Sequence, residues 1–154
     1  NGYFALKGKI QKNLLDNWMN LPFIDQKVPK SFDNYFFQIE DYLINNKNLP
    51  IYDILATLNK FSADVITKSK NFFSGKIDRW ILCGGGAKNK CLFKNIKNNV
   101  ENVVLSNELG WDMDFIESQA FAYLAIRKIK NLHSTYTETT GVKIPTVCGE
   151  LYQP

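Results

Sequence analysis

The feature that most constrains the fold is a glycine turn between a short apolar run and an amphipathic segment. The apolar run over residues 79–83 is short and bounded by turn residues, so we predict a buried strand. A helix is predicted over 89–98 and a second strand over 102–106. Strand, turn, helix and strand in this order form a βαβ unit, which favours a parallel pair and an α/β fold. The turn itself, residues 83–89, reads Cys83-Gly84-Gly85-Gly86-Ala87-Lys88-Asn89.

Helical periodicity dominates the rest of the chain. Apolar residues recur at helical spacing over residues 10–19, 31–45, 51–72 and 114–130. A short further strand is expected at 146–148. Two or three strands are too few to cover this many helices. We therefore expect a helix-rich part of a lobe with a short, incomplete sheet, parallel or mixed, whose other strands lie upstream.

Several residues predict how these helices begin, end and pack. Ser31 is a candidate N-cap, and Pro50 suits the first turn of the next helix. Gly75 follows the same helix, where a left-handed C-cap favours glycine. The segment 114–130 is apolar almost all round, which is typical of a helix buried between layers.

Composition excludes several classes of protein. The 154 residues fit one domain, and 45% hydrophobic with 22% charged residues argues against wholesale disorder. The net charge of +4 comes from lysines spread along the chain, so we expect no nucleic-acid partner. No apolar run approaches the roughly 20 residues that span a bilayer, and we expect no membrane span and no secretory signal. Because the first residue is Asn1 and not methionine, we expect further residues upstream.

The cysteines and the histidine do not suggest a metal site. Cys83, Cys91 and Cys148 are widely spaced, and His133 has no partner at ligand spacing. We therefore expect no metal ligands in the chain. Free thiols are typical of a reducing compartment, which favours the cytoplasm.

The glycine turn is the segment most suggestive of ligand binding. Glycines after a strand allow close approach of a ligand to the backbone. Unpaired N–H groups and the positive dipole end of the following helix suit an anion or a nucleotide, and Lys88 adds charge. The spacing fits neither a Walker A loop nor a dinucleotide fingerprint, which requires glycine where Asn89 stands. A plain strand-to-helix turn is the alternative.

An acidic cluster opens the last predicted helix. Asp112, Asp114 and Glu117 could contact a metal or a nucleotide. Asp114 as N-cap with Glu117 three residues later also imitates a capping box, and capping is the simpler interpretation of the local pattern. Lys30 with Ser31 could contact phosphate, although capping again explains Ser31.

The order of several short motifs along the whole chain is a more specific signal than any one of them alone. They are Gly2-x-x-Ala5-x-x-Gly8-x-Ile10, Pro29-Lys30-Ser31 with Phe37, Asp53-Ile54-Leu55-Ala56-Thr57-Leu58, the glycine turn with Ile81-Leu82, Glu117-x-x-Ala120-Phe121-Ala122-Tyr123-Leu124-Ala125, and Gly141-Val142 with Gly149-Glu150-Leu151-Tyr152-x-Pro154. In sequence and spacing this set resembles the anhydro-N-acetylmuramic acid kinase family, a branch of the sugar kinase and actin superfamily.

The resemblance implies part of a two-lobed enzyme. Members of this family have RNase H-like, actin-like ATPase lobes. They use ATP and Mg²⁺ to convert 1,6-anhydro-N-acetylmuramic acid to N-acetylmuramic acid 6-phosphate during peptidoglycan recycling, while water opens the anhydro ring. The family's catalytic aspartate and its other phosphate-binding segments precede the Gly2 motif. Residues 1–154 would therefore form the C-terminal, nucleotide-binding portion of one lobe, with no second domain and no catalytic residue of their own.

The same resemblance assigns candidate ligand contacts. It places Gly84, Gly85, Gly86, Ala87 and Asn89 on the ATP or ADP side of the cleft and lets Glu117 face the nucleotide. The anhydro amino sugar would be held through the other lobe. The sequence departs from the family where Lys88 replaces the usual arginine, where 32–34 replace Thr-Gly-Arg, and where 115–118 replace Asp-Met-Glu-Ala.

A second hypothesis places the chain in a different functional class. A non-catalytic remnant or interaction module would keep the packed helices and use the open sheet edge to pair with a separately encoded N-terminal half. Pairing as a homodimer is a further possibility. In either case we expect the chain alone to lack useful kinase activity.

Overall fold

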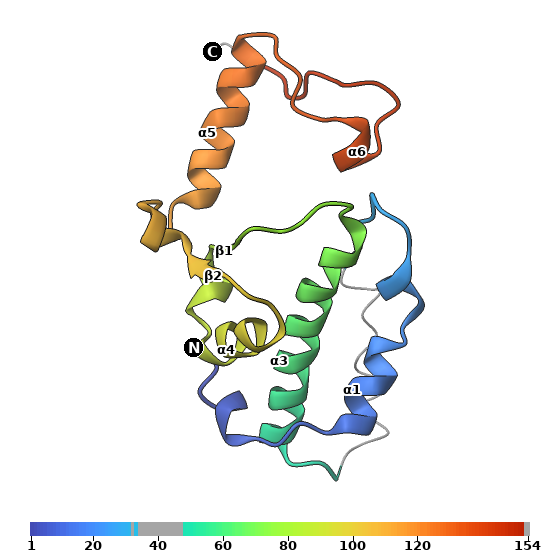
Figure 1. The fold of residues 1–154 in the computed structure, drawn as a ribbon. Coiled ribbons are helices and arrows are strands. Elements are labelled where there is room, and N and C mark those ends of the chain that lie inside the picture. The colour runs from blue at the N-terminus through green and yellow to red at the C-terminus, as the bar shows by residue number, and fades with distance from the viewer. Residues whose placement is uncertain (32, 34–47, 153–154) are drawn as a thin grey trace.

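The computed structural model describes residues 1–31, 33 and 48–152 as a helix-rich α/β fold (Figure 1). The helix expected over 31–45 lies outside the described residues, and with it the capping role of Ser31. The remaining elements follow the predicted order. The helices are α1 (Lys12–Met19), α3 (Ile51–Lys68), α4 (Lys90–Asn99), α5 (Ile116–Ile129) and the short α6 (Thr137–Thr140), and the strands are β1 (Trp80–Leu82) and β2 (Val103–Leu105).

The two strands form the predicted parallel pair. Trp80 pairs with Val103 and Leu82 with Leu105, and α4 makes the crossover between the strands. Trp80 and Leu82 pack with α3 and α4 in a cluster centred on Ile96, which is 1% exposed. Ile81 points to the opposite face of the sheet, as alternation along a strand requires, and it is exposed. The α/β class and the short sheet are confirmed.

Helix α3 is the central packing element. Its apolar residues recur at helical spacing, so one side packs against α1 and another against α4 (Figure 1). On the α1 side, Trp18 is fully buried edge-on against Phe61. Pro50 caps α3 and stands just before its first turn. The expectation for Gly75 is wrong: α3 ends at Lys68 and continues into a 3-10 helix over Ser69–Phe72, and the φ angle of Gly75 is not positive.

The N-terminal segment is fastened across the first turns of α3. The Asp53 carboxylate accepts hydrogen bonds from the Lys9 N–H at 2.8 Å and from the Gln11 side-chain amide at 2.7 Å. The Thr57 hydroxyl, fully buried, accepts from the Gln11 N–H at 2.9 Å and donates to the Asp53 carbonyl at 2.7 Å. Gly8 packs so closely that a Cβ there would lie 1.8 Å from the Tyr52 carbonyl oxygen. The sequence motifs around residues 2–10 and 53–58 thus meet in space.

Helix α5 does not lie between layers, which corrects the sequence-based expectation. It has the predicted extent to within two residues, but none of its residues is buried. Phe121 is 72% exposed and Ile129 is 70% exposed. The physical reason is that the layers needed to cover a helix without a polar face are absent from the described part of the chain. Figure 1 shows α5 leading away from the two strands towards the C-terminal segment.

The C-terminal segment folds back along α5. Arg127 holds it there, donating from Nε to the His133 carbonyl at 2.6 Å and from its two terminal nitrogens to the Tyr123 and Tyr136 hydroxyls. The strand expected at 146–148 is reduced to a single antiparallel bridge between Thr135 and Thr146. Among the described residues, none of the helices has the length and apolar character needed to cross a bilayer.

Candidate functional site

The glycine turn lies at the carboxyl end of β1, beside the end of β2 (Figure 1). Gly84 has φ +74° and ψ −179°, a backbone conformation that is essentially restricted to glycine. Gly85–Lys88 then form one turn of 3-10 helix that leads directly into α4. The strand therefore reverses direction at Gly84 without a side chain at its apex.

The hydrogen bonds of the turn leave several backbone donors unused. The Ala87 N–H donates to the Gly84 carbonyl at 3.1 Å, and the Asn89 N–H donates to the Gly86 carbonyl at 3.0 Å. The N–H groups of Gly84, Gly85 and Gly86 donate to no other group in the described part of the chain. Adjacent free N–H groups on a turn are suited to binding an anion.

The space beside the first two glycines is open. A Cβ atom built on Gly84 or Gly85 would meet no atom within 4 Å. A separate apolar hollow of about 130 Å³ lies next to the turn, below the roughly 300 Å³ at which ligand pockets begin. It is lined by Ile66, Leu82, Cys83, Gly86, Ala87, Leu92, Phe93 and Ile96. A ligand of nucleotide size would thus have to lie over the open side of the turn.

The start of α4 is already satisfied, contrary to the expectation of unpaired N–H groups there. The Asn89 side-chain oxygen accepts hydrogen bonds from the N–H groups of Cys91 and Leu92, each at 3.1 Å. The Lys90 N–H donates to the Asn1 carbonyl at 3.3 Å. Asn89 is therefore the N-cap of α4, and the free donors belong to the glycine turn.

The structure brings Lys88 and the acidic cluster together. The Lys88 ammonium forms an ion pair with the Asp114 carboxylate, and both side chains are about half exposed. The expected capping box is wrong. Helix α5 begins at Ile116 after Phe115, which provides no side-chain cap, and the Asp112 carboxylate accepts from the Asp114 N–H at 2.9 Å. Because parallel strands end at one sheet edge, the segments after β1 and β2 meet there.

Glu117 stands in the first turn of α5 with its side chain exposed. Its carboxylate makes no hydrogen bond or ion pair with another described residue. Its proposed nucleotide contact therefore stays a prediction. The neighbouring Lys88–Asp114 pair was not predicted, although opposite charges after adjacent parallel strands are the signal that could have revealed it.

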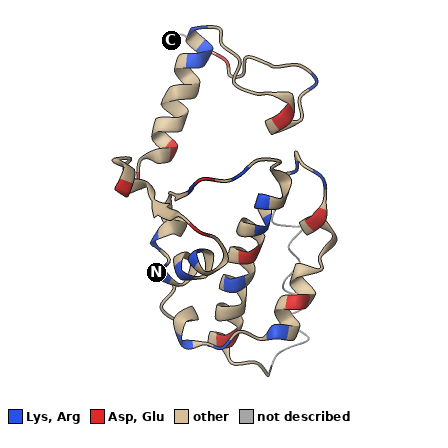
Figure 2. Cartoon of the chain, in the orientation of Figure 1, with Lys and Arg blue, Asp and Glu red and all other residues tan. Residues whose placement is uncertain are grey.

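The other residues that the sequence singled out, Lys30 and His133, make contacts within the protein. The Lys30 ammonium donates to the carbonyls of Ile24 at 2.7 Å and Phe23 at 3.1 Å and lies over the Phe72 ring. His133 packs edge-on against Tyr136 near the surface. Within the described ranges, no three His, Cys, Asp or Glu side chains converge as a metal site would require. Lys and Arg side chains are scattered over several elements and do not gather on one face (Figure 2).

A second polar group, which the sequence did not indicate, surrounds Cys148. Its sulfur lies 3.5 Å from the Thr135 hydroxyl, and its N–H donates to the Ser134 hydroxyl at 3.0 Å. Hydrogen bonding with Thr135 and then with Ser134 lowers the pKa of this thiol. Burial raises the pKa of Cys91. All three cysteines carry free thiols, as expected.

The fold and the site together define a class of protein. A parallel strand pair with a glycine turn at its carboxyl edge, backed by α3 and α4, is consistent with part of a sugar kinase lobe.

Comparison with known proteins then specifies the family. The family model described as anhydro-N-acetylmuramic acid kinase matches residues 1–154. Proteins named anhydro-N-acetylmuramic acid kinase are 39% identical in Methylorubrum populi, over 100% of this chain and 40% of the relative, and 34% identical in Actinobacillus pleuropneumoniae, over 99% and 43%. The chain belongs to the anhydro-N-acetylmuramic acid kinase family and spans about 40% of the length of these relatives.

Proposed function

We propose that the chain forms the C-terminal, nucleotide-binding part of one lobe of an ATP-dependent kinase. The complete enzyme would phosphorylate 1,6-anhydro-N-acetylmuramic acid while water opens the anhydro ring, giving N-acetylmuramic acid 6-phosphate and ADP. This activity would serve peptidoglycan recycling in the cytoplasm. Family membership and the names of the relatives support the proposal.

The observation that carries the nucleotide-binding role is the open glycine turn. Gly84 and Gly85 have free space where side chains would otherwise stand, and Gly85 and Gly86 keep free N–H donors. Backbone donors in such a turn suit the phosphate oxygens of ATP. Gly84, Gly85, Gly86, Ala87 and Asn89 would line the nucleotide. Glu117 would face it.

The chain's own residues would bind and orient the nucleotide. ATP supplies the transferred phosphoryl group. The described residues hold no group of three acidic, histidine or cysteine side chains that could bind Mg²⁺ without the nucleotide. We infer that the ligands of Mg²⁺, the catalytic base and the sugar contacts come from the remainder of the kinase. The Lys88–Asp114 pair would fix the segment before α5 against the turn.

ATP titration of two matched variants tests this role. Gly85→Asp places a carboxylate in the open space of the turn, and we expect ATP affinity measured by calorimetry to fall at least tenfold through repulsion of phosphate. Gly75→Asp is the control, because its Cβ also meets no atom within 4 Å but lies outside the turn. Equal affinity of the wild type and Gly85→Asp would show that the turn is only structural.

The exposed apolar helix favours a second candidate function. A non-catalytic module that pairs with a separately encoded N-terminal half would also leave α5 uncovered in the chain alone. The reading frame directly upstream separates the two candidates. An in-frame segment with the family's phosphate-binding motif favours an intact enzyme, and a stop codon favours the module.

A further inference from the structure

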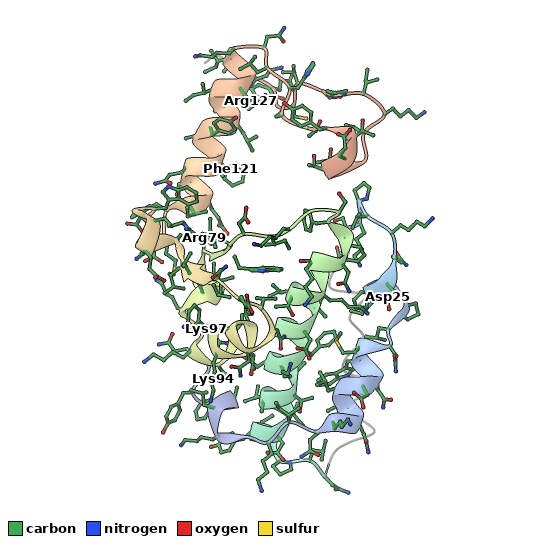
Figure 3. All side chains as sticks on the ribbon, viewed as in Figure 1. Asp25, Arg79, Lys94, Lys97, Phe121 and Arg127 are labelled. Carbon is green, nitrogen blue, oxygen red and sulfur yellow. The ribbon has the colours of Figure 1, made fainter. Side chains whose placement is uncertain are left out.

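The first two residues of the chain lie against the start of α4, directly after the glycine turn. The Asn1 carbonyl accepts a hydrogen bond from the Lys90 N–H at 3.3 Å. A Cβ atom built on Gly2 would lie 2.0 Å from the Asn89 side-chain oxygen and 3.0 Å from the Cys91 Cβ. Figure 3 shows the side chains of the N-terminal segment next to those of α4, on which Lys94 and Lys97 are labelled. Gly2 therefore touches the residue that joins the turn to the helix.

Asn89 holds the glycine turn with its backbone and α4 with its side chain. Its N–H donates to the Gly86 carbonyl at 3.0 Å, and its side-chain oxygen accepts from the N–H groups of Cys91 and Leu92. That capping oxygen is the atom that a side chain at residue 2 would displace. Because an oxygen that leaves the cap releases both N–H groups, the cap of α4 depends on glycine at residue 2.

The N-terminal segment, residues 1–11, connects α4 with α3. Gly2 has φ +73°, and its carbonyl accepts the Leu6 N–H at 3.1 Å, which turns the chain towards the buried Ala5 and the surface of α3. Residues 8–11 are then fastened to the first turns of α3, as described above. A hollow of about 430 Å³ lies between the segment, α3 and Asn89. The contact at Gly2 is thus a separate joint at the α4 end of the segment.

We propose that Gly2 is a positioning residue for the nucleotide-binding turn. It leaves room for the Asn89 oxygen, the oxygen fixes the start of α4, and the Asn89 N–H fixes Gly86. The free N–H groups of the turn are thereby held in one orientation, and donors that are already ordered bind an anion more tightly than mobile ones. The inference rests on the proposed nucleotide role of the turn and adds that the N-terminal segment sets the geometry of that turn.

Gly2→Ala tests the proposal on protein that near-UV circular dichroism shows to be folded. We expect the hydrogen-exchange protection of the Cys91 and Leu92 amides, measured by NMR, to fall about fivefold, as loss of one helix cap implies. ATP affinity, measured by calorimetry, should fall by a similar factor. Unchanged ATP affinity in Gly2→Ala, with normal binding by the wild type, overturns the proposal.

Gly149→Ala is the matched control for backbone strain. Gly149 also has a positive φ, +89°, but its added Cβ would meet only the Lys128 Cγ at 4.0 Å, an ordinary contact. We expect this variant to keep the ATP affinity of the wild type and the protection of the Cys91 and Leu92 amides. An equal loss in both variants would mean that strain at a positive φ accounts for the effect, and Gly2 would have no positioning role.

A double variant shows whether Gly2 acts through Asn89. Asn89→Gly removes the oxygen that Gly2→Ala displaces, and glycine is tolerated at a helix N-cap. In the Asn89→Gly background, Gly2→Ala should change ATP affinity by less than about twofold. A further fivefold loss in that background contradicts the proposal. If Gly2→Ala alone does not fold, a folded double variant with the ATP affinity of Asn89→Gly supports the proposal, and a double variant that stays unfolded overturns it.

The same titrations separate failure of this inference from failure of the proposed function. If the wild type binds no ATP, or binds it no better than Gly85→Asp does, the nucleotide role is wrong and the positioning role falls with it. If Gly85→Asp loses ATP while Gly2→Ala keeps the affinity of the wild type, the nucleotide role stands and only the positioning role is wrong.

Discussion

Gly8 shows how one residue fixes the path of the N-terminal segment. Its φ angle is −87°, so the requirement is not conformational but steric. An added Cβ would lie 1.8 Å from the Tyr52 carbonyl oxygen and 2.7 Å from the Asp53 nitrogen. Both are backbone atoms in the first turn of α3. Backbone cannot yield as a flexible side chain does. We expect Gly8→Ala to lower the free energy of unfolding by about 1–3 kcal/mol, measured by urea denaturation.

The control for Gly8→Ala is Gly75→Ala, because open space surrounds Gly75 and its φ is not positive. Its unfolding free energy should stay within about 0.5 kcal/mol of the wild type. Equal losses for the two variants would contradict the steric account.

The cysteines are expected to react at different pH. The thiolate is the reactive form, so a lowered pKa increases reactivity near neutral pH. Hydrogen bonds with Thr135 and Ser134 lower the pKa of Cys148, whereas burial raises the pKa of Cys91. As the pH rises from 6 to 10, the iodoacetamide labelling rate of Cys148 should rise first. Peptide mass spectrometry measures each rate.

Removing the neighbouring hydroxyls supplies the control. The double variant with Ser134→Ala and Thr135→Val should move the labelling profile of Cys148 to higher pH and leave that of Cys91 unchanged. Labelling of Cys91 ahead of Cys148 would show that this assignment of thiol environments is wrong.

At the scale of elements, one buried hydroxyl joins the N-terminal segment to α3. The Thr57 hydroxyl satisfies the Gln11 N–H at 2.9 Å in a site with no exposed surface. Thr57→Val keeps the shape but leaves that N–H unpaired. Because an unpaired buried donor loses its hydration without compensation, we expect a loss of about 1–3 kcal/mol in urea denaturation and faster proteolysis before residue 12.

Ser62→Ala is the matched change on the same helix. The Ser62 side chain is exposed, and its hydroxyl donates to the Leu58 carbonyl of its own helix at 3.0 Å. Its removal should change stability by less than about 0.5 kcal/mol. If Thr57→Val were equally harmless, Asp53 alone would hold the segment.

Elements that depend on local pattern were predictable, and their surroundings were not. The helix predicted over 89–98 matches α4, which begins at Lys90 because the Asn89 side chain caps it through the N–H groups of Cys91 and Leu92. The parallel pairing followed from the βαβ order. The length of α5 was also readable, but its exposure was not, since burial depends on whatever packs against it. The role of Asp114 was missed because its partner, Lys88, lies on a different element.

The candidate site could also be predicted from the sequence only in part. Its position at the end of β1 and its glycines could be read from the sequence, because a strand followed by glycines is a local signal. Which donors remain free could not, since the Lys90 N–H is taken by Asn1, a residue distant in the sequence. Residue 84 needs glycine for its φ of +74°, whereas Gly85 is required only if a ligand approaches it. That difference makes Gly85 the more informative position for substitution.

At the scale of the whole molecule, the proposed function gives the chain one side of a reaction that needs two. Phosphoryl transfer depends on groups that hold the nucleotide, the metal ion and the acceptor in line, and misplacement of any of them costs orders of magnitude in rate. The described residues offer an open turn for a nucleotide but no converging metal ligands.

We therefore expect ADP release by this chain alone, with ATP, Mg²⁺ and the anhydro sugar, to equal the enzyme-free background in a coupled assay. Co-expression with the remaining part of the Methylorubrum populi kinase should restore sugar-dependent ADP release, and Gly85→Asp should remove it while the two polypeptides stay associated. Turnover by the isolated chain would mean that its own residues complete the active site, and the division of the enzyme between the two parts would then be wrong.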